Sequence, residues 1–180
     1  MLAAQAADRI YVASDSLTCA GDRIIPPARP KFVTIGGWVI GWSGALMYTQ
    51  AYLDGLERAH KDGKDLGSRE VHRDVQKYVA DLATSLTPPD HVELEAVMAK
   101  GTSLLRLSEN EMPLDWPVAA IGSGAEIGWY LMRDHIKTQV WVGGPQPLVK
   151  ILREASTVYP SVGPPFFWTD TKTGNIRRTE

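Results

Sequence analysis

The chain has 180 residues, 44% hydrophobic and 22% charged, which is typical of a globular protein with one sizeable core. Its formal net charge of −2 and the lack of a long basic run exclude an evident nucleic-acid surface. A single cysteine excludes an intrachain disulfide and a cysteine cluster for a metal. The sequence shows neither a signal peptide nor an apolar run of the ~18 residues that a membrane span needs, so we expect a cytoplasmic protein.

The first third of the chain predicts two β-hairpins and a helix. Short apolar runs on either side of a polar break place one pair of hairpin strands at residues 1–4 and 10–13. β-Branched and aromatic residues around Gly36-Gly37 place a second pair at residues 31–35 and 38–42. Residues 16–30 contain a glycine and three prolines and predict a loop. From residue 45 to about residue 60 the apolar residues recur at helical spacing, which predicts the first helix.

The rest of the chain predicts three more helices and further strands. Ser68 has the residue type of an N-cap for a second helix, which we expect to end at Pro88-Pro89. Three strands are expected at residues 93–99, 103–107 and 117–121. Two helices are expected at residues 125–137 and 146–158. A closing strand or hairpin begins at residue 166, with Gly174-Asn175 as its turn.

Hairpins therefore alternate with pairs of helices, a pattern that does not fit a parallel sheet, in which single strands and single helices alternate. Two antiparallel sheets stacked between two helical layers would bury both faces of each sheet, which suits the mainly apolar strand at 38–42. We therefore predict an α+β fold, a four-layer αββα sandwich. No repeat, low-complexity segment or linker is evident, so we expect a single domain over residues 1–180.

Three landmarks carry a resemblance to a known family. They are Ala13-Ser14-Asp15-Ser16; the pair of strands 31–35 and 38–42 followed by Ser43-Gly44; and Ala120-Ile121-Gly122-Ser123-Gly124. Their order and spacing over residues 1–137 resemble the proteasome β-type subunits, especially the HslV-like members of the N-terminal nucleophile (Ntn) hydrolases. The resemblance implies the αββα fold of that family and a threonine-type peptidase site.

The resemblance also implies roles for four residues. In these enzymes the first residue of the mature chain, usually threonine, attacks a peptide carbonyl, and its own free α-amine acts as the general base. By position, Lys31 matches the lysine that helps this amine to stay neutral, and Asp15 matches the aspartate that holds the lysine. Ser123 matches the serine beside the terminal amine, and Gly44 matches the glycine whose N–H stabilises the oxyanion.

Each of these residues also has a structural interpretation. Lys31 is expected at a strand start, where a solvated charge is common, and Asp15 could cap the turn after the second strand. Ser123 could be the N-cap of the third helix. Gly44 could only permit a tight turn between strand and helix.

The nucleophile itself is the missing part. At the family's spacing it would lie about two residues before Met1, and none of residues 1–4 (Met-Leu-Ala-Ala) has a hydroxyl or thiol. The family's Asp followed by Ser-Gly after the last long helix is also absent, because residues 157–165 have no Asp and two adjacent prolines.

Three functions remain open. The first, which we favour, is a non-hydrolytic subunit that serves a structural or binding role in a homo-oligomer such as a ring. The second is an active threonine-type peptidase, acting on peptides or proteins, whose nucleophile lies just upstream of Met1. The third is an unrelated α+β binding domain. None of them implies a metal, an organic cofactor, a nucleic acid or a membrane.

Overall fold

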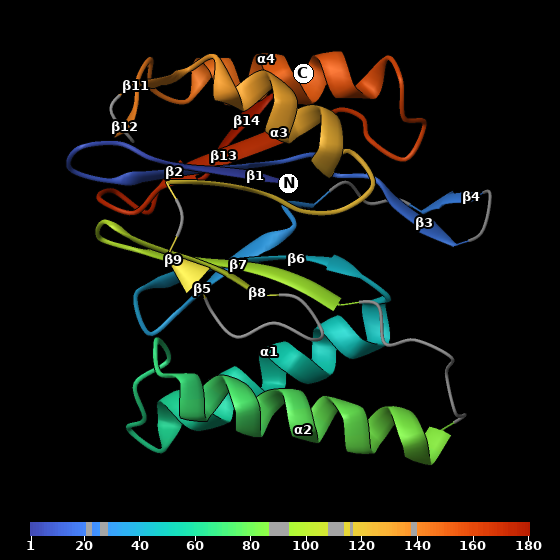
Figure 1. Ribbon diagram of the computed structural model, residues 1–180. Coiled ribbons are helices and arrows are strands. Elements are labelled where there is room, and N and C mark those ends of the chain that lie inside the picture. Colours follow the sequence, from blue (N-terminus) through green and yellow to red (C-terminus); the bar gives the residue numbers. More distant parts are fainter. Residues whose placement is uncertain (21–22, 26–28, 87–93, 108–113, 116, 138–139) are drawn as a thin grey trace.

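The structure is a computed structural model of residues 1–180, which describes the chain except for residues 21–22, 26–28, 87–93, 108–113, 116 and 138–139. Figure 1 shows four stacked layers: helices α3 and α4, a first sheet, a second sheet, and helices α1 and α2. The predicted α+β, four-layer αββα sandwich is therefore confirmed.

Each large sheet is antiparallel and has five strands. The first sheet has the order β10 (Val118–Ala120), β1 (Leu2–Gln5), β2 (Ile10–Ser14), β13 (Phe166–Asp170) and β14 (Arg177–Thr179). The second has the order β5 (Phe32–Ile35), β6 (Trp38–Gly44), β7 (Leu94–Lys100), β8 (Ser103–Leu107) and β9 (Leu114–Asp115). The helices are α1 (Leu46–Lys61), α2 (Arg69–Leu86), α3 (Ala125–Arg133) and α4 (Gln146–Ser156). Two small hairpins complete the described elements: β3 (Thr18–Ala20) with β4 (Arg23–Ile25), and β11 (Ile136–Lys137) with β12 (Val140–Trp141).

Side-chain alternation along the strands separates three apolar clusters, one at each interface between layers. In β1, Leu2 and Ala4 pack with residues of α4, whereas Ala3 joins a cluster between the two sheets. Met1 belongs to this cluster between the sheets. The third cluster lies between the second sheet and helices α1 and α2 and includes Trp38.

The predicted elements are largely confirmed, and their differences from the structure have local causes. Ser68 accepts a hydrogen bond from the Val71 N–H (3.2 Å), as expected of an N-cap for α2. The third helix ends at Arg133, four residues earlier than predicted, because the chain then turns into the β11–β12 hairpin. The predicted end of the second helix at Pro88-Pro89 lies outside the described residues.

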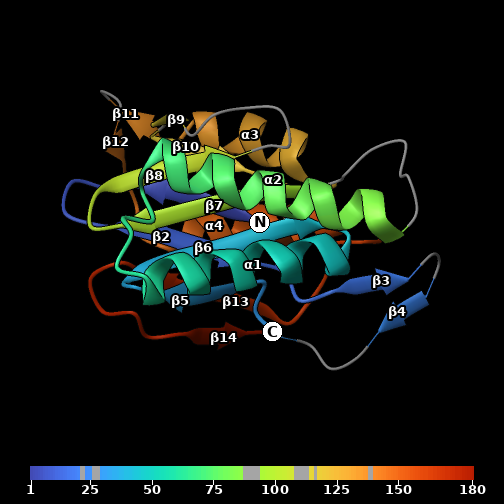
Figure 2. The same cartoon turned by 90° about the horizontal axis from the view of Figure 1, so that it is seen from below.

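The segment predicted as a loop over residues 16–30 contains the β3–β4 hairpin. In both Figure 1 and Figure 2 this hairpin stands away from the two large sheets. Its strands are only three residues long, too short for the glycine- and proline-containing sequence to show a strand pattern.

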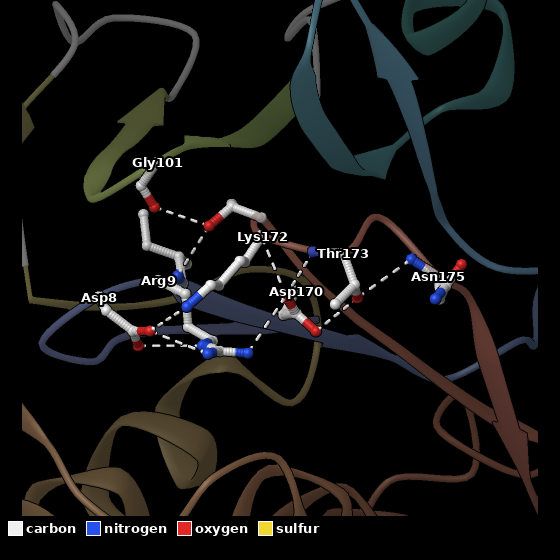
Figure 3. Close-up of polar contacts among 9 residues, drawn as sticks. Asp8, Arg9, Gly101, Asp170, Lys172, Thr173 and Asn175 are labelled. Atoms are coloured by element: carbon white, nitrogen blue, oxygen red, sulfur yellow. Dashed lines mark hydrogen bonds and ion pairs between the residues drawn. The ribbon is translucent and has the colours of Figure 1, made fainter.

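At one end of the sandwich, a network of hydrogen bonds and ion pairs connects turns of the two sheets (Figure 3). The carboxylate of Asp170 accepts hydrogen bonds from the Lys172 N–H (2.9 Å), the Thr173 N–H (2.8 Å) and the Thr173 hydroxyl (2.8 Å). Arg9 lies 3.8 Å from the same carboxylate. Burial alone would raise the pKa of Asp170, but the hydrogen bonds from Thr173 and Lys172 and the charge of Arg9 lower it overall. The network therefore fixes the turn after β13 against the β1–β2 turn.

A neighbouring residue links this network to the second sheet. The Thr171 hydroxyl accepts a hydrogen bond from the Ile10 N–H (3.0 Å) and donates one to the Gly101 carbonyl (2.7 Å). Gly101 forms the turn between β7 and β8, so Thr171 joins the two sheets at this end.

Candidate active site

The opposite end of the sandwich contains a cleft of about 400 Å³. It is lined by Leu17, Lys31, Trp42, Ser43, Gly44, Ala45, Leu46, Thr49, Ser123 and Ser161. A smaller hollow of about 30 Å³ shares Lys31, Trp42, Ser43 and Ser123 with the cleft and adds Met1 and Asp15. The start of β1, the end of β2, the end of β6 and the β10–α3 loop thus meet at one place. All four residues singled out in the sequence lie around it.

Lys31 and Asp15 form an ion pair. The Lys31 Nζ lies 2.7 Å from the Asp15 Oδ1, and the Asp15 side chain is only 4% exposed. The same carboxylate oxygen accepts a hydrogen bond from the Leu17 N–H (2.9 Å), so Asp15 also caps its turn. The Ser14 hydroxyl accepts a hydrogen bond from the Lys31 N–H (3.2 Å), which fixes the backbone of the lysine against β2. In the structure Asp15 thus contacts Lys31 and also caps its turn, and Lys31 is a paired cation.

The α-amine of Met1 is buried beside this ion pair. It donates a hydrogen bond to the Ile121 carbonyl (2.9 Å), and the Ile121 N–H donates one back to the Met1 carbonyl (3.1 Å). The pKa of the amine is lowered overall from its usual 8.0 to about 6: burial is the largest cause and Lys31 also lowers it, while Asp15 and Glu95 act in the opposite direction. The amine therefore carries little charge at neutral pH.

The loop between β10 and α3 brings Ser123 to the cleft. Its hydroxyl lies 2.7 Å from the hydroxyl of Ser161, a contact that the sequence did not reveal because 38 residues separate the two. The N-cap of α3 is Gly124, without a side-chain cap, so the structural interpretation of Ser123 as the N-cap is wrong. Ser123 is instead a cleft residue paired with a second serine.

Two glycines of β6 lie near the site. Gly44, the last residue of β6, has a φ of 121° and lines the cleft just before α1, which fits both the predicted site position and a tight turn. Gly41 was not singled out from the sequence. A Cβ at Gly41 would occupy the space of the Met1 Sδ and Cε, so this glycine leaves room for the end of the Met1 side chain between the sheets. The presence of two glycines three residues apart in one strand was the feature of the sequence that could have identified Gly41.

Within the described residues, no group of three His, Cys, Asp or Glu side chains could hold a metal ion. No helix among those same residues is long and apolar enough to cross a membrane.

No protein-family model matches the sequence, and no curated protein matches it. Solved structures do match. Anbu (ancestral beta-subunit) from Yersinia bercovieri has a TM-score of 0.77 and 17% identity, covering 98% of this chain and 85% of its own. HslV from Trypanosoma brucei has a TM-score of 0.70 and 15% identity, covering 94% and 97%. BPH from Thiobacillus denitrificans, solved in complex with epoxomicin, has a TM-score of 0.74 and 13% identity, covering 94% and 96%. The chain therefore has the fold of the proteasome-like Ntn hydrolases, and at these identities the likeness shows the fold alone.

Proposed function

We propose that this chain, with its proteasome-like Ntn-hydrolase fold, forms a peptide-binding cleft that hydrolyses amide bonds when a nucleophilic residue precedes Met1 by two positions. A polypeptide that begins at Met1 binds peptides there without cleaving them. The observation that carries the proposal is the Lys31–Asp15 ion pair, at 2.7 Å, beside a buried chain start.

The strand register supports the two-residue distance. In the antiparallel pair of β1 and β10, Leu2 lies opposite Ala120 and Ala3 opposite Ala119. Each residue added before Met1 therefore lies opposite a residue one position further along the chain after Ile121. One residue before Met1 comes opposite Gly122, and two residues before it comes opposite Ser123. Because side chains alternate along a strand, the second of these shares the face of Met1 and Ala3, between the sheets. Its hydroxyl would then lie on the Lys31 side of β1, and its α-amine beside Ser123.

The chemistry at that position follows from the neighbouring charges. The hydroxyl of the first residue attacks the substrate carbonyl, and the free α-amine accepts its proton and passes it to the leaving nitrogen as the C–N bond breaks. Water then hydrolyses the ester that remains and restores the hydroxyl. The ammonium of Lys31, held by Asp15, disfavours a second positive charge, so it keeps this amine in the basic form. We propose Gly44, at the cleft wall, as the backbone N–H donor for the oxyanion.

The lining of the cleft indicates the substrate class. Of the described residues that line it, Lys31 is charged and is paired with Asp15, while Leu17, Trp42 and Leu46 provide apolar surface. A carboxylate that could bind a basic side chain is not among those described residues. We therefore propose an extended peptide with an uncharged, apolar side chain next to the cleaved bond.

The experiment that tests the function is a series of N-terminal extensions. One, two or three threonines are placed ahead of Met1, each chain is released from a fusion that leaves no other residue, and cleavage of fluorogenic peptides is measured. Only the two-threonine chain should be active, at least ~100-fold above the others, because the other two start on the opposite face of β1.

Two controls make this result specific. Replacing the first of the two threonines by alanine, or making Lys31→Ala in the two-threonine chain, should abolish the activity. Inactivity of all three extended chains, each folded as judged by circular dichroism, would contradict a hydrolytic site and leave the non-hydrolytic subunit.

We also propose that residues 1–180 act as one domain and that this domain forms a homo-oligomer. A solved structure with the same fold is described as the helical assembly of the Anbu complex from Pseudomonas aeruginosa (TM-score 0.74, 17% identity). Light scattering of the purified chain should give a mass well above that of one 19.8 kDa chain, and a monomer at micromolar concentration would contradict this proposal.

A further inference from the structure

A partly exposed acidic residue, Glu95, lies at the site end of the face between the two sheets. In β7, Leu94, Ala96 and Met98 pack toward α1 and α2, whereas Val97 and Ala99 face the first sheet. Glu95 has the same alternation as Val97 and Ala99, so it projects toward the first sheet, opposite Ser43 in the register of β6 and β7. Its side chain is 32% exposed, so the carboxylate is partly removed from water there.

Glu95 has two partners, and they come from different sheets. Its Oε1 lies 3.2 Å from the Arg106 Nη2 on the neighbouring strand β8. Its Oε2 accepts a hydrogen bond from the Gly122 N–H (2.8 Å) in the β10–α3 loop of the first sheet. Glu95 therefore bridges the two sheets at the site end of the sandwich.

The Gly122 N–H is available to Glu95 because of the strand pairing. Met1 and Ile121 exchange both of their backbone hydrogen bonds, so in an antiparallel pair the next residue, Gly122, directs its N–H away from β1. Gly122 has a φ of 86°, and a Cβ there would lie 2.7 Å from the Ser43 Oγ. The loop that carries Ser123 is thus pressed against the second sheet and tied to it by Glu95.

From this geometry we infer that Glu95, oriented by Arg106, is a positioning residue that holds the Gly122–Gly124 loop against the start of β1. The inference rests on the proposed function, because that loop is the segment opposite the two residues that would precede Met1. Glu95 does not touch the substrate in this scheme; it acts through Gly122 on the position of Ser123.

Glu95 also affects the charge state of the chain start. Besides Glu95, the charged groups that act on the Met1 amine are Asp15 at the end of β2 and Lys31 before β5. Glu95 raises the pKa of that amine, against the effect of burial. A side chain of the same shape without the charge should therefore lower the pKa of the amine while still accepting the Gly122 hydrogen bond.

The test compares Glu95→Gln, Glu95→Ala and a control, Glu57→Gln, which removes an exposed carboxylate from α1. All are made in the chain that begins at Met1, so no catalysis is needed. The chain contains five methionines. With ¹³Cα-labelled methionine, the Met1 signal is recognised by its titration with pH, and amide hydrogen exchange reports on Gly122.

Glu95→Gln should lower the midpoint of the Met1 titration and keep the Gly122 amide protected. Glu95→Ala should also lower the midpoint and speed exchange at Gly122 by at least ~10-fold, since its acceptor is lost. Glu57→Gln should leave both measurements unchanged. An unchanged Met1 midpoint in Glu95→Gln, or an equally protected Gly122 in Glu95→Ala, would overturn the inference.

Activity is then measured in the two-threonine chain. There Glu95→Ala should lower kcat about 10-fold with little change in KM, and Glu95→Gln should restore most of the loss. If the two-threonine parent is inactive while the titration and exchange results hold, the proposed function fails and the positioning role of Glu95 stands.

Discussion

Met1 and Lys31 line the same small hollow, and the positive charge of Lys31 disfavours a positive charge on the Met1 α-amine. Burial is the larger cause of the low pKa of the amine, and Lys31 adds to it. In a polypeptide that begins at Met1, we expect the Met1 ¹³Cα signal to titrate with a midpoint near 6.

Lys31→Met should raise that midpoint, because it removes the positive charge and leaves the negative charge of Asp15. A double variant, Lys31→Met with Asp15→Asn, serves as the control with no charge at either position. Its midpoint should fall below that of Lys31→Met. A midpoint that does not respond to Lys31→Met would mean that the lysine does not act on the chain start.

His72 provides a second prediction at the residue scale. Its side chain is buried, and its Nδ1 lies 3.0 Å from the hydroxyl of Tyr52. Burial lowers the pKa of His72 from 6.5 to about 4. The unfolded chain therefore binds a proton between these values that the folded chain does not. Stability should be full above pH 6.5 and fall by about 3 kcal/mol as the pH drops toward 4.

Urea unfolding at pH 7, 5.5 and 4.5 measures this loss. His72→Gln should unfold more easily at pH 7 but show a shallower dependence on pH over the same range. The exposed His60 supplies the control: His60→Gln should keep the wild-type slope. Equal slopes for His72→Gln and the wild type would show that other groups cause the acid sensitivity.

At the scale of elements, the β10–α3 loop is packed tightly against the second sheet at Gly122. Gly122→Ala would place a Cβ 2.7 Å from the Ser43 Oγ at a positive φ of 86°. We expect a loss of about 2–3 kcal/mol in the free energy of unfolding. Gly101→Ala is the matched control, with a φ of 58° and open space around the added Cβ. It should cost only about 1 kcal/mol. A cost for Gly122→Ala no larger than this would show that the loop moves to accommodate the side chain.

The elements themselves could be predicted from the sequence where local signals are strong. Two short apolar runs separated by a polar break identified the strands that became β1 and β2, and Ser68 identified the start of α2. The β3–β4 hairpin was not predicted, because strands of three residues are too short to show a strand pattern in the sequence. The contacts of Ser161 with Ser123 and of Glu95 with Gly122 were not predicted, because the partners are 38 and 27 residues apart in the sequence.

The site could be predicted only in part, because several of its contacts join residues that are far apart in the sequence. The pairing of Asp15 with Lys31 was expected from the family resemblance alone, because the strands beside them, β2 and β5, belong to different sheets and no local pattern brings their ends together. Gly44 marks a change from strand to helix that is visible in the sequence. The contact between Gly41 and the Met1 side chain could not be predicted, because it depends on how the two sheets stack.

At the scale of the whole molecule, the two ends of the sandwich differ in structure: one contains the cleft and the other contains the polar network around Asp170. β2 runs from Ile10, beside Thr171, to Ser14, beside Lys31. β7 likewise runs from Glu95 at the site toward the Gly101 turn at the far end. The site end carries the cleft, and the far end carries the network around Asp170 (Figure 3). The two ends are connected through strands whose central residues are buried and apolar.

This separation predicts that stability can be lowered at the far end without changing the site. Asp170→Ala would leave the Lys172 and Thr173 N–H groups without their acceptor, at a cost of about 2–3 kcal/mol in urea unfolding. Thr171→Val, which removes one link between the sheets, should cost about 1–2 kcal/mol. Neither variant should move the Met1 titration midpoint, whereas Glu95→Gln should move it with little loss of stability. A shifted midpoint in Asp170→Ala would mean that the far-end network sets the register of β1 and β2, so that the site depends on both ends of the sandwich.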